Sequence, residues 1–303
     1  MFALYSAIWR VSARRQISLI VLSLIIAGLA AVPLSYQKDI INGLTDGSLD
    51  RDGLVWLCIG MFALILLSLI LKWLMGYLSS VLGEDTIRLL RNRIYTVSSS
   101  NHAEDVQGGT LATMVSAEAE ELGKFTGGAF SDPVVQIGTL ISVIGFIAST
   151  QPGLGAIALC MIVPQVILVL LTQAQVNRLV AERVRILRRS TDQIVAQDIE
   201  GEKQAVLDDF DRIFETRRRM FIWKLSTKFV LSAINGAGTV AVLALGGWLV
   251  LKGRTDVGTV VAATIGLGRI QGPTAFLIAF YRQVSATRVK FELLQDLVLP
   301  ARR

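Results

Sequence analysis

One arginine stands in the middle of the last long apolar run of the sequence. Arg269 lies twelve residues after Val257 and is followed by Gln271 and Pro273. A charge at membrane depth costs roughly 2.5 to 3.5 kcal/mol on insertion scales, so it usually faces a helix-bundle interior or water. We therefore predict that Arg269, Gln271 and Pro273 line a cavity that attracts an anionic group. The alternative is structural, with Arg269 paired to a polar neighbour such as Gln136 or extended toward the interface.

Other residue types that carry chemistry are sparse. Cys58 and Cys160 both lie inside apolar runs without CxxC spacing, and His102 is the single histidine. These counts exclude a disulfide scaffold and a multi-histidine metal centre, and each cysteine is interpreted as a small buried hydrophobe. Lys72 is interpreted as a side chain that extends to the interface. We expect no catalytic residue, no metal and no cofactor on this chain.

Composition and hydropathy place the chain in a membrane. Hydrophobic residues make up 52% of the 303 residues, charged residues 18%, and the mean hydropathy is +0.56. A helix needs about 20 apolar residues to cross a hydrocarbon core of about 30 Å. Runs near that length are 17–34, 54–82, 130–148, 154–171, 229–251 and 257–280. They are too long and uniform for barrel strands, so we predict an all-α membrane protein with six transmembrane helices.

Basic residues are distributed unevenly between the connections. With the N-terminus inside, 24 Lys and Arg lie in inner segments, and only Lys38, Arg51, Lys252 and Arg254 lie in outer ones. Positive charge collects on the cytoplasmic side, so both termini are predicted to be cytoplasmic. A cleavable signal peptide is the alternative for 17–34, but that run is long for one and five more follow. We expect a multi-pass protein of the plasma membrane, which in bacteria is the inner membrane.

Two inner connections, 83–129 and 172–228, are much longer than the outer ones. Val176, Val180 and Leu187 recur near a 3.6-residue period, which is typical of an amphipathic helix. Each connection is therefore predicted as helix, turn, helix. At 1.5 Å per residue, about 25 residues carry each turn on the order of 35 Å below the membrane. A partner is expected at these tips; the alternative is a self-contained cytoplasmic bundle. No linker separates a second domain, so residues 1–303 are expected to form one membrane domain.

Short motifs occur at the tips of both arms. The first consists of Gly109, Leu111, Thr113, Met114 and Glu118, and the second of Gln197 and Gly201. With six spans and two inner arms, the chain resembles the transmembrane domain of exporter-type ATP-binding cassette (ABC) transporters. That family carries Gly-x-Leu-x-Ser-Arg-x-x-x-Asp at its first coupling helix. Met114 replaces the arginine, and Gln197 stands where the second motif has an acid.

The resemblance implies a permease subunit that exports a substrate by alternating access. The motif residues would contact an ATPase, and the cavity expected around Arg269 would be the translocation cavity. The sequence carries no GxxxxGK[ST] phosphate loop, since Glu118 stands where the Gly123–Lys124 pair would need its leading glycine. We therefore expect ATP and Mg on a separate ABC ATPase subunit, together with a second transmembrane subunit in a homodimer or heterodimer.

Two other functions stay open on sequence grounds. A membrane scaffold or regulator without an ATPase would use the arms to hold a partner. A secondary transporter would show inverted-repeat halves and charged midplane residues, and here only Arg269 fits. Nucleic-acid binding is not expected, because Arg217, Arg218 and Arg219 lie among acidic residues without interleaved aromatics.

Overall fold

The chain is helical throughout the part that can be described. The computed structural model describes residues 2–100, 119–195 and 199–298, and every element in these ranges is an α-helix. The described chain divides into two compact units, Met1–Gly155 with Leu245–Arg303, and Ala156–Ala244. The prediction of an all-α protein is confirmed.

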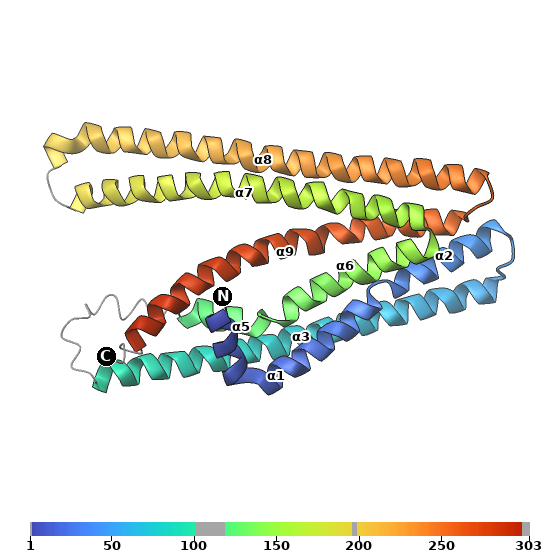
Figure 1. Cartoon of the computed structure of the whole chain (residues 1–303), viewed down its shortest axis with the longest axis horizontal. Helices are drawn as coiled ribbons and strands as arrows, with labels where there is room; N and C mark the ends of the chain where they lie inside the picture. Colours follow the sequence, from blue (N-terminus) through green and yellow to red (C-terminus); the bar gives the residue numbers. More distant parts are fainter. Residues whose placement is uncertain (1, 101–118, 196–198, 299–303) are drawn as a thin grey trace. The chain divides into compact units, whose positions relative to one another are not determined.

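The first unit is built from six helices and the short ends of two more. The six are α1 (Phe2–Leu29), α2 (Val32–Thr45), α3 (Arg51–Ser100), α5 (Ala119–Gly128), α6 (Ser131–Thr150) and α9 (Val257–Val298). Helix α6 packs against both α1 and α9, α5 packs against α3, and α2 packs against α9 (Figure 1). Helix α3 also contacts α1, so α1, α3, α6 and α9 form one connected group of helices.

Helix α1 is bent at Ser12, whose backbone is not helical (φ −134°, ψ 17°). The Ser12 hydroxyl donates to the Ile8 carbonyl oxygen at 2.8 Å. The residues before the bend are anchored by Leu4 and Ile8, which are buried in a cluster with Phe125 and Val284. After the bend, the buried Gln16 Nε2 donates to the Thr126 carbonyl oxygen at 2.8 Å. Both sides of the bend are thus tied to α5.

The outer connection predicted over 35–53 is mostly helix. Helix α2 begins just before Pro33, a residue whose fixed φ suits the first turn of a helix, and it runs to Thr45. The chain reverses only over 46–50, where Gly47 has φ +63°. The search for apolar runs did not predict this helix, which lies mostly beyond the run 17–34, because α2 is stabilised by packing on α9 rather than by its own hydropathy.

The C-terminal part of α2 and the start of α9 are joined by a polar contact. Asn42 Oδ1 accepts from the Gly258 backbone N–H at 2.7 Å, and Asp256 Oδ1 accepts from the Thr259 N–H at 2.6 Å. Burial acts to raise the pKa of Asp256, but hydrogen bonds with Thr259 and Asn42 and the charge of Lys38 outweigh it, so the pKa lies below its usual value. This contact caps α9 and fixes its start against α2.

The second unit is made by α7 (Pro152–Val195) and α8 (Ile199–Leu251), which run side by side (Figure 1). Gln165 Nε2 on α7 donates to Asn235 Oδ1 on α8 at 2.8 Å. A Cβ at Gly238 would lie 1.7 Å from Met161 Sδ, so the two helices touch where α8 has no side chain. Each helix continues unbroken from the predicted span into the predicted arm. The prediction that 172–228 is helical is therefore confirmed on both sides of 196–198.

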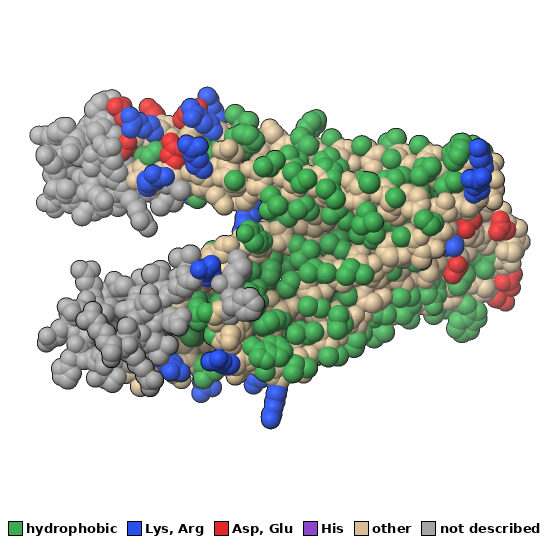
Figure 2. Space-filling view, viewed as in Figure 1, with side chains coloured by type: hydrophobic (Ala, Val, Ile, Leu, Met, Phe, Trp, Pro, Cys, Tyr) green, Lys and Arg blue, Asp and Glu red, His purple; other side chains and the backbone are tan. Residues whose placement is uncertain are grey.

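Five helical stretches in the described residues are long and apolar enough to cross a membrane. They are Ala3–Thr45, Arg51–Thr96, Ala119–Thr150, Pro152–Val180 and Leu207–Leu251. Figure 2 shows one face, on which hydrophobic side chains cover the middle of the helices and charged ones gather toward their ends. The sixth predicted span, 257–280, lies in α9 and is not in this set, since Arg269, Gln271 and Pro273 lower its hydropathy; its crossing stays a prediction.

Both cysteines are exposed, contrary to the expectation that they are buried. Cys58 lies on α3 and Cys160 on α7. Apolar side chains of α3 such as Trp56, Ile59 and Phe62 are exposed as well. A helix that is apolar and yet uncovered suits a lipid environment, where the hydrocarbon replaces a protein core.

Candidate functional site

A cavity of about 470 Å³ lies among α1, α3, α6 and α9 of the first unit; we call it the Arg269 cavity. Its wall is mostly aliphatic. The polar side chains that line it are Ser68, Lys72, Gln136, Thr139 and Arg269. The lining residues of α1, α3 and α6 all belong to the stretches that are apolar enough to cross a membrane. A few polar groups in an apolar wall are the usual composition of a small-molecule site.

Arg269 is half-buried and bonds to the backbone. Its Nη1 donates to the Ala30 carbonyl oxygen at 3.2 Å. Ala30 follows the end of α1 at Leu29, where the last carbonyls of a helix have no intrahelical donor. The hydrogen bond therefore satisfies a free carbonyl, but a carbonyl does not neutralise a guanidinium. The polar partner expected for the structural alternative, Gln136, lines the same cavity without a hydrogen bond to Arg269 in the described part of the chain.

Lys72 lines the same cavity from α3. Lys72 and Arg269 are the two basic residues inside the predicted spans, and the structure brings both to one cavity. No Asp or Glu lines it among the residues placed in the structure. Asp132, one turn before Gln136 on α6, forms no ion pair with the described residues, and its carboxylate lies over Gly128, where a Cβ would be 2.1 Å from Oδ2. The cavity is therefore cationic.

Pro273 lines the cavity on α9, one turn after Arg269. Proline has no N–H, so the Arg269 carbonyl, four residues earlier, loses its helical donor and α9 is weakened at the cavity. Gln271 is exposed and is not a lining residue. The structure therefore brings two of the three predicted residues together and leaves Gln271 on the outside of α9.

A close contact joins α1 and α6 at residues next to lining residues of the cavity. A Cβ at Gly138 on α6 would lie 2.5 Å from Ala27 Cβ on α1. Small residues at such a crossing let two helix backbones approach closely, which holds α1 and α6 in register. Gly123 on α5 makes a similar contact with α3, where a Cβ would be 2.8 Å from the Gly83 carbonyl oxygen. The first predicted arm thus returns against its own outgoing helix.

Most of the predicted coupling residues fall outside the described residues. These are Gly109, Leu111, Thr113, Met114, Glu118 and Gln197. Gly201 lies in the first turn of α8, which begins at Ile199. On either side of 101–118 the chain is helical, in α3 up to Ser100 and in α5 from Ala119.

Comparison with known protein families shows which family the chain belongs to. The family model for the ABC transporter transmembrane region matches residues 17–274. The chain belongs to this family. The match runs from the start of the first predicted span to one residue beyond Pro273, so it includes the whole Arg269 cavity. None of the curated proteins compared with it matches the sequence.

Family membership confirms the resemblance and the fold class. The chain has the transmembrane fold of ABC exporters, and it is a multi-pass membrane protein with the character of a permease. The matched region is a membrane region that is not catalytic by itself. Membership of this family implies an ATPase domain and dimerisation.

Sequence reasoning did not place Lys72 at the Arg269 cavity. It was interpreted as a side chain extending to the interface, but it faces the cavity that contains Arg269. The signal was present, because these are the two basic residues within the predicted spans. The sequence did not indicate that the two residues lie at the same cavity, because Lys72 and Arg269 are almost 200 residues apart in the chain.

Proposed function

We propose that this chain is the permease subunit of an ATP-driven exporter. A substrate would cross by alternating access through the Arg269 cavity, and a separate ABC ATPase subunit would bind Mg-ATP and hydrolyse it. The observation that carries this proposal is the family match over 17–274, which includes both the cavity and the arms. Helices α3, α7 and α8, which continue from the apolar stretches into the arms without a break, support mechanical coupling between the two ends.

Contact with the ATPase is assigned to the arm tips. The proposed contact residues are Gly109, Leu111, Thr113, Met114, Glu118, Gln197 and Gly201. On this proposal, ATP binding and hydrolysis move the tips, and the arms pass the motion to the membrane helices. The weakened stretch of α9 at Pro273 is where that motion would change the shape of the cavity wall.

A second transmembrane subunit, identical or related, completes the translocation path on this proposal. The chain would lie in the plasma membrane, in bacteria the inner membrane, with both termini cytoplasmic. The charge distribution supports this orientation, because inner segments hold 24 of the Lys and Arg and outer ones four.

The cavity favours an anionic substrate. Two cations in a largely aliphatic wall are costly unless an opposite charge or water compensates them. The lining residues supply no carboxylate, so a phosphate, sulfate or carboxylate group on the substrate would fill that role. The aliphatic remainder of the wall suits an apolar portion on the same molecule.

The assembly is tested by purifying the chain in mild detergent and measuring ATPase activity in what accompanies it. We expect an ABC ATPase subunit, and we expect Glu118→Lys to weaken its retention at least about tenfold by reversing a charge at the contact. Glu84→Lys, an equal charge reversal on the exposed surface of α3, is the control.

Two outcomes would contradict this proposal. A folded chain that brings down no ATPase would exclude ATP-driven export and favour a membrane scaffold. Retention that falls equally in Glu118→Lys and Glu84→Lys would show that the first arm tip is not the contact.

A further inference from the structure

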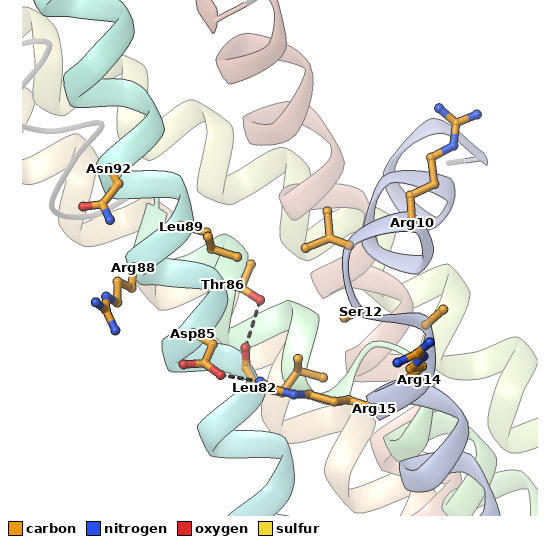
Figure 3. Close-up of a pocket in the computed structure, with 12 residues that line it drawn as sticks. Arg10, Ser12, Arg14, Arg15, Leu82, Asp85, Thr86, Arg88, Leu89 and Asn92 are labelled. Atoms are coloured by element: carbon orange, nitrogen blue, oxygen red, sulfur yellow. Dashed lines mark hydrogen bonds and ion pairs between the residues drawn. The ribbon is translucent and has the colours of Figure 1, made fainter.

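A second cavity, of about 710 Å³, lies between α1 and α3 (Figure 3); we call it the boundary cavity. Four arginines line it, Arg10, Arg14 and Arg15 from α1 and Arg88 from α3. Asp85 is the single acid among its lining residues. None of these residues lines the Arg269 cavity, so the two cavities are separate features of the first unit.

The boundary cavity carries a surplus of positive charge. Arg15 reaches across from α1 to form an ion pair with Asp85 on α3 (Figure 3). Arg10, Arg14 and Arg88 have no ion-pair partner in the ranges that the structure describes, and all three are exposed. Figure 3 shows Arg10 and Arg88 extending outward from their own helices. The rim of the cavity therefore carries three arginines that pair with no carboxylate in the described ranges, and the side chains of Arg10 and Arg88 are turned away from the space between α1 and α3 (Figure 3).

The bend in α1 places these arginines around one cavity. Because Ser12 is not helical, Arg10 precedes the bend and Arg14 and Arg15 follow it. Leu4 and Ile8 hold the first part in a buried cluster, and Gln16 holds the second part through its hydrogen bond to Thr126. The arrangement is therefore fixed from both sides by buried contacts.

The boundary cavity lies where the apolar surface of the helices gives way to charged surface. On α1 the exposed side chains of Ile17 and Val21 follow Arg14, and on α3 the exposed Leu78 and Val81 precede Asp85. Trp9 is 40% exposed and packs edge-on against Phe130. Tryptophan gathers at the headgroup level of a membrane, and cationic side chains lie beside it there.

We propose that the boundary cavity binds the headgroup of an anionic phospholipid of the cytoplasmic leaflet. The arginines supply positive potential and hydrogen-bond donors for the lipid phosphate, as basic pockets between membrane helices do. The acyl chains lie along the exposed apolar faces that begin at Ile17 on α1 and at Val81 on α3. The lipid is bound beside the bundle and is not the exported molecule, so this site does not depend on the function proposed for the Arg269 cavity.

The test compares lipid retention by the full chain and two variants in mixed micelles of phosphatidylglycerol and phosphatidylcholine. The wild-type chain is expected to enrich phosphatidylglycerol. Arg14→Gln with Arg88→Gln leaves the Arg15–Asp85 pair intact and is expected to lower the enrichment at least about tenfold, since each juxtamembrane arginine is worth about fivefold. Arg178→Gln with Arg217→Gln removes two exposed cytoplasmic charges from α7 and α8 and is expected to leave enrichment unchanged.

Three results would overturn the proposal. Equal enrichment in the Arg14/Arg88 variant and the wild type would show that these arginines only set topology. Equal loss in the control would show a general charge effect. Displacement of the lipid by millimolar inorganic phosphate would mean that the cavity binds a soluble phosphate. Arg14→Lys with Arg88→Lys keeps both charges and is expected to keep most of the enrichment, which separates charge from misfolding.

Discussion

The two cavities of the first unit are both cationic, but their charges are held in different surroundings. The Arg269 cavity has two cations in a mostly aliphatic wall, and Arg269 bonds to a carbonyl oxygen. The boundary cavity has four exposed arginines, of which one is paired with Asp85. Coulomb interactions weaken as the surrounding dielectric rises, so a charge counts for more in the first cavity than in the second. A few half-buried charges are suited to selecting a ligand. Many exposed charges are suited to attracting the anionic surface of a membrane.

The largest effect is expected at Arg269. Arg269→Ala should weaken binding of a dansylated fatty acid at least about tenfold, because a hydrogen bond to a charged group is worth about 1.5 to 3 kcal/mol. A dansylated alkylamine of equal length should bind no worse. Arg254→Ala removes an exposed arginine of the connection between α8 and α9 and serves as the control in fluorescence titrations. If the two variants bind the fatty acid alike, the Arg269 cavity does not select anions.

The next effect concerns the support of the boundary cavity. Gln16→Leu removes the donor to the Thr126 carbonyl, which lies in the last turn of α5 and has no intrahelical donor. We expect a loss of about 1 to 2 kcal/mol in stability, measured by thermal unfolding in detergent, together with weaker phosphatidylglycerol enrichment. The effect is moderated because Gln16 Oε1 has no hydrogen-bond partner within the described chain.

Gln283→Leu, an exposed glutamine on α9, is the matched control for Gln16→Leu and should change neither quantity. If Gln16→Leu unfolds at the wild-type temperature, the bend of α1 is held by its apolar contacts alone. If Gln16→Leu unfolds at a lower temperature but keeps full phosphatidylglycerol enrichment, the bend does not position the arginines.

Raising the salt concentration should weaken ligand binding at the two cavities to different extents. Raising the ionic strength from 0.1 M to 1 M shortens the Debye length from about 10 Å to about 3 Å, and exposed charges are screened most. We expect phosphatidylglycerol enrichment to fall several-fold, while fatty-acid binding at the Arg269 cavity falls less. Equal losses in the two titrations would contradict the difference in surroundings on which the comparison rests.

The smallest effect is expected at the ion pair of the boundary cavity. Asp85→Asn breaks an exposed pair, and such pairs contribute about 0 to 1 kcal/mol, so thermal unfolding should change little. Loss of the single lining acid should raise phosphatidylglycerol enrichment by up to about fivefold. A decrease in enrichment would mean that Asp85 positions Arg15 for the lipid rather than competing with it.

Contacts between helices distant in sequence were harder to predict than the helices themselves. The apolar runs located α1, α3, α6, α7 and α8, because a long helix in lipid is marked by its own side chains. Helix α2 was missed because packing on α9 stabilises it. Gln271 was expected in the cavity with Arg269, but two residues along a helix is about 200°, which turns it to the other side of α9.

The sequence by itself determined the all-helical membrane architecture and the family. These follow from local hydropathy, charge distribution and spacing, each of which is a property of neighbouring residues. Only the tertiary structure decided that Lys72 and Arg269 line one cavity, that Arg269 donates a hydrogen bond to the Ala30 carbonyl oxygen, and that arginines of α1 and α3 line a second cavity. The reason is that contacts between helices depend on the rotation and bending of each helix, which small-residue crossings and buried hydrogen bonds set only when the helices are packed together.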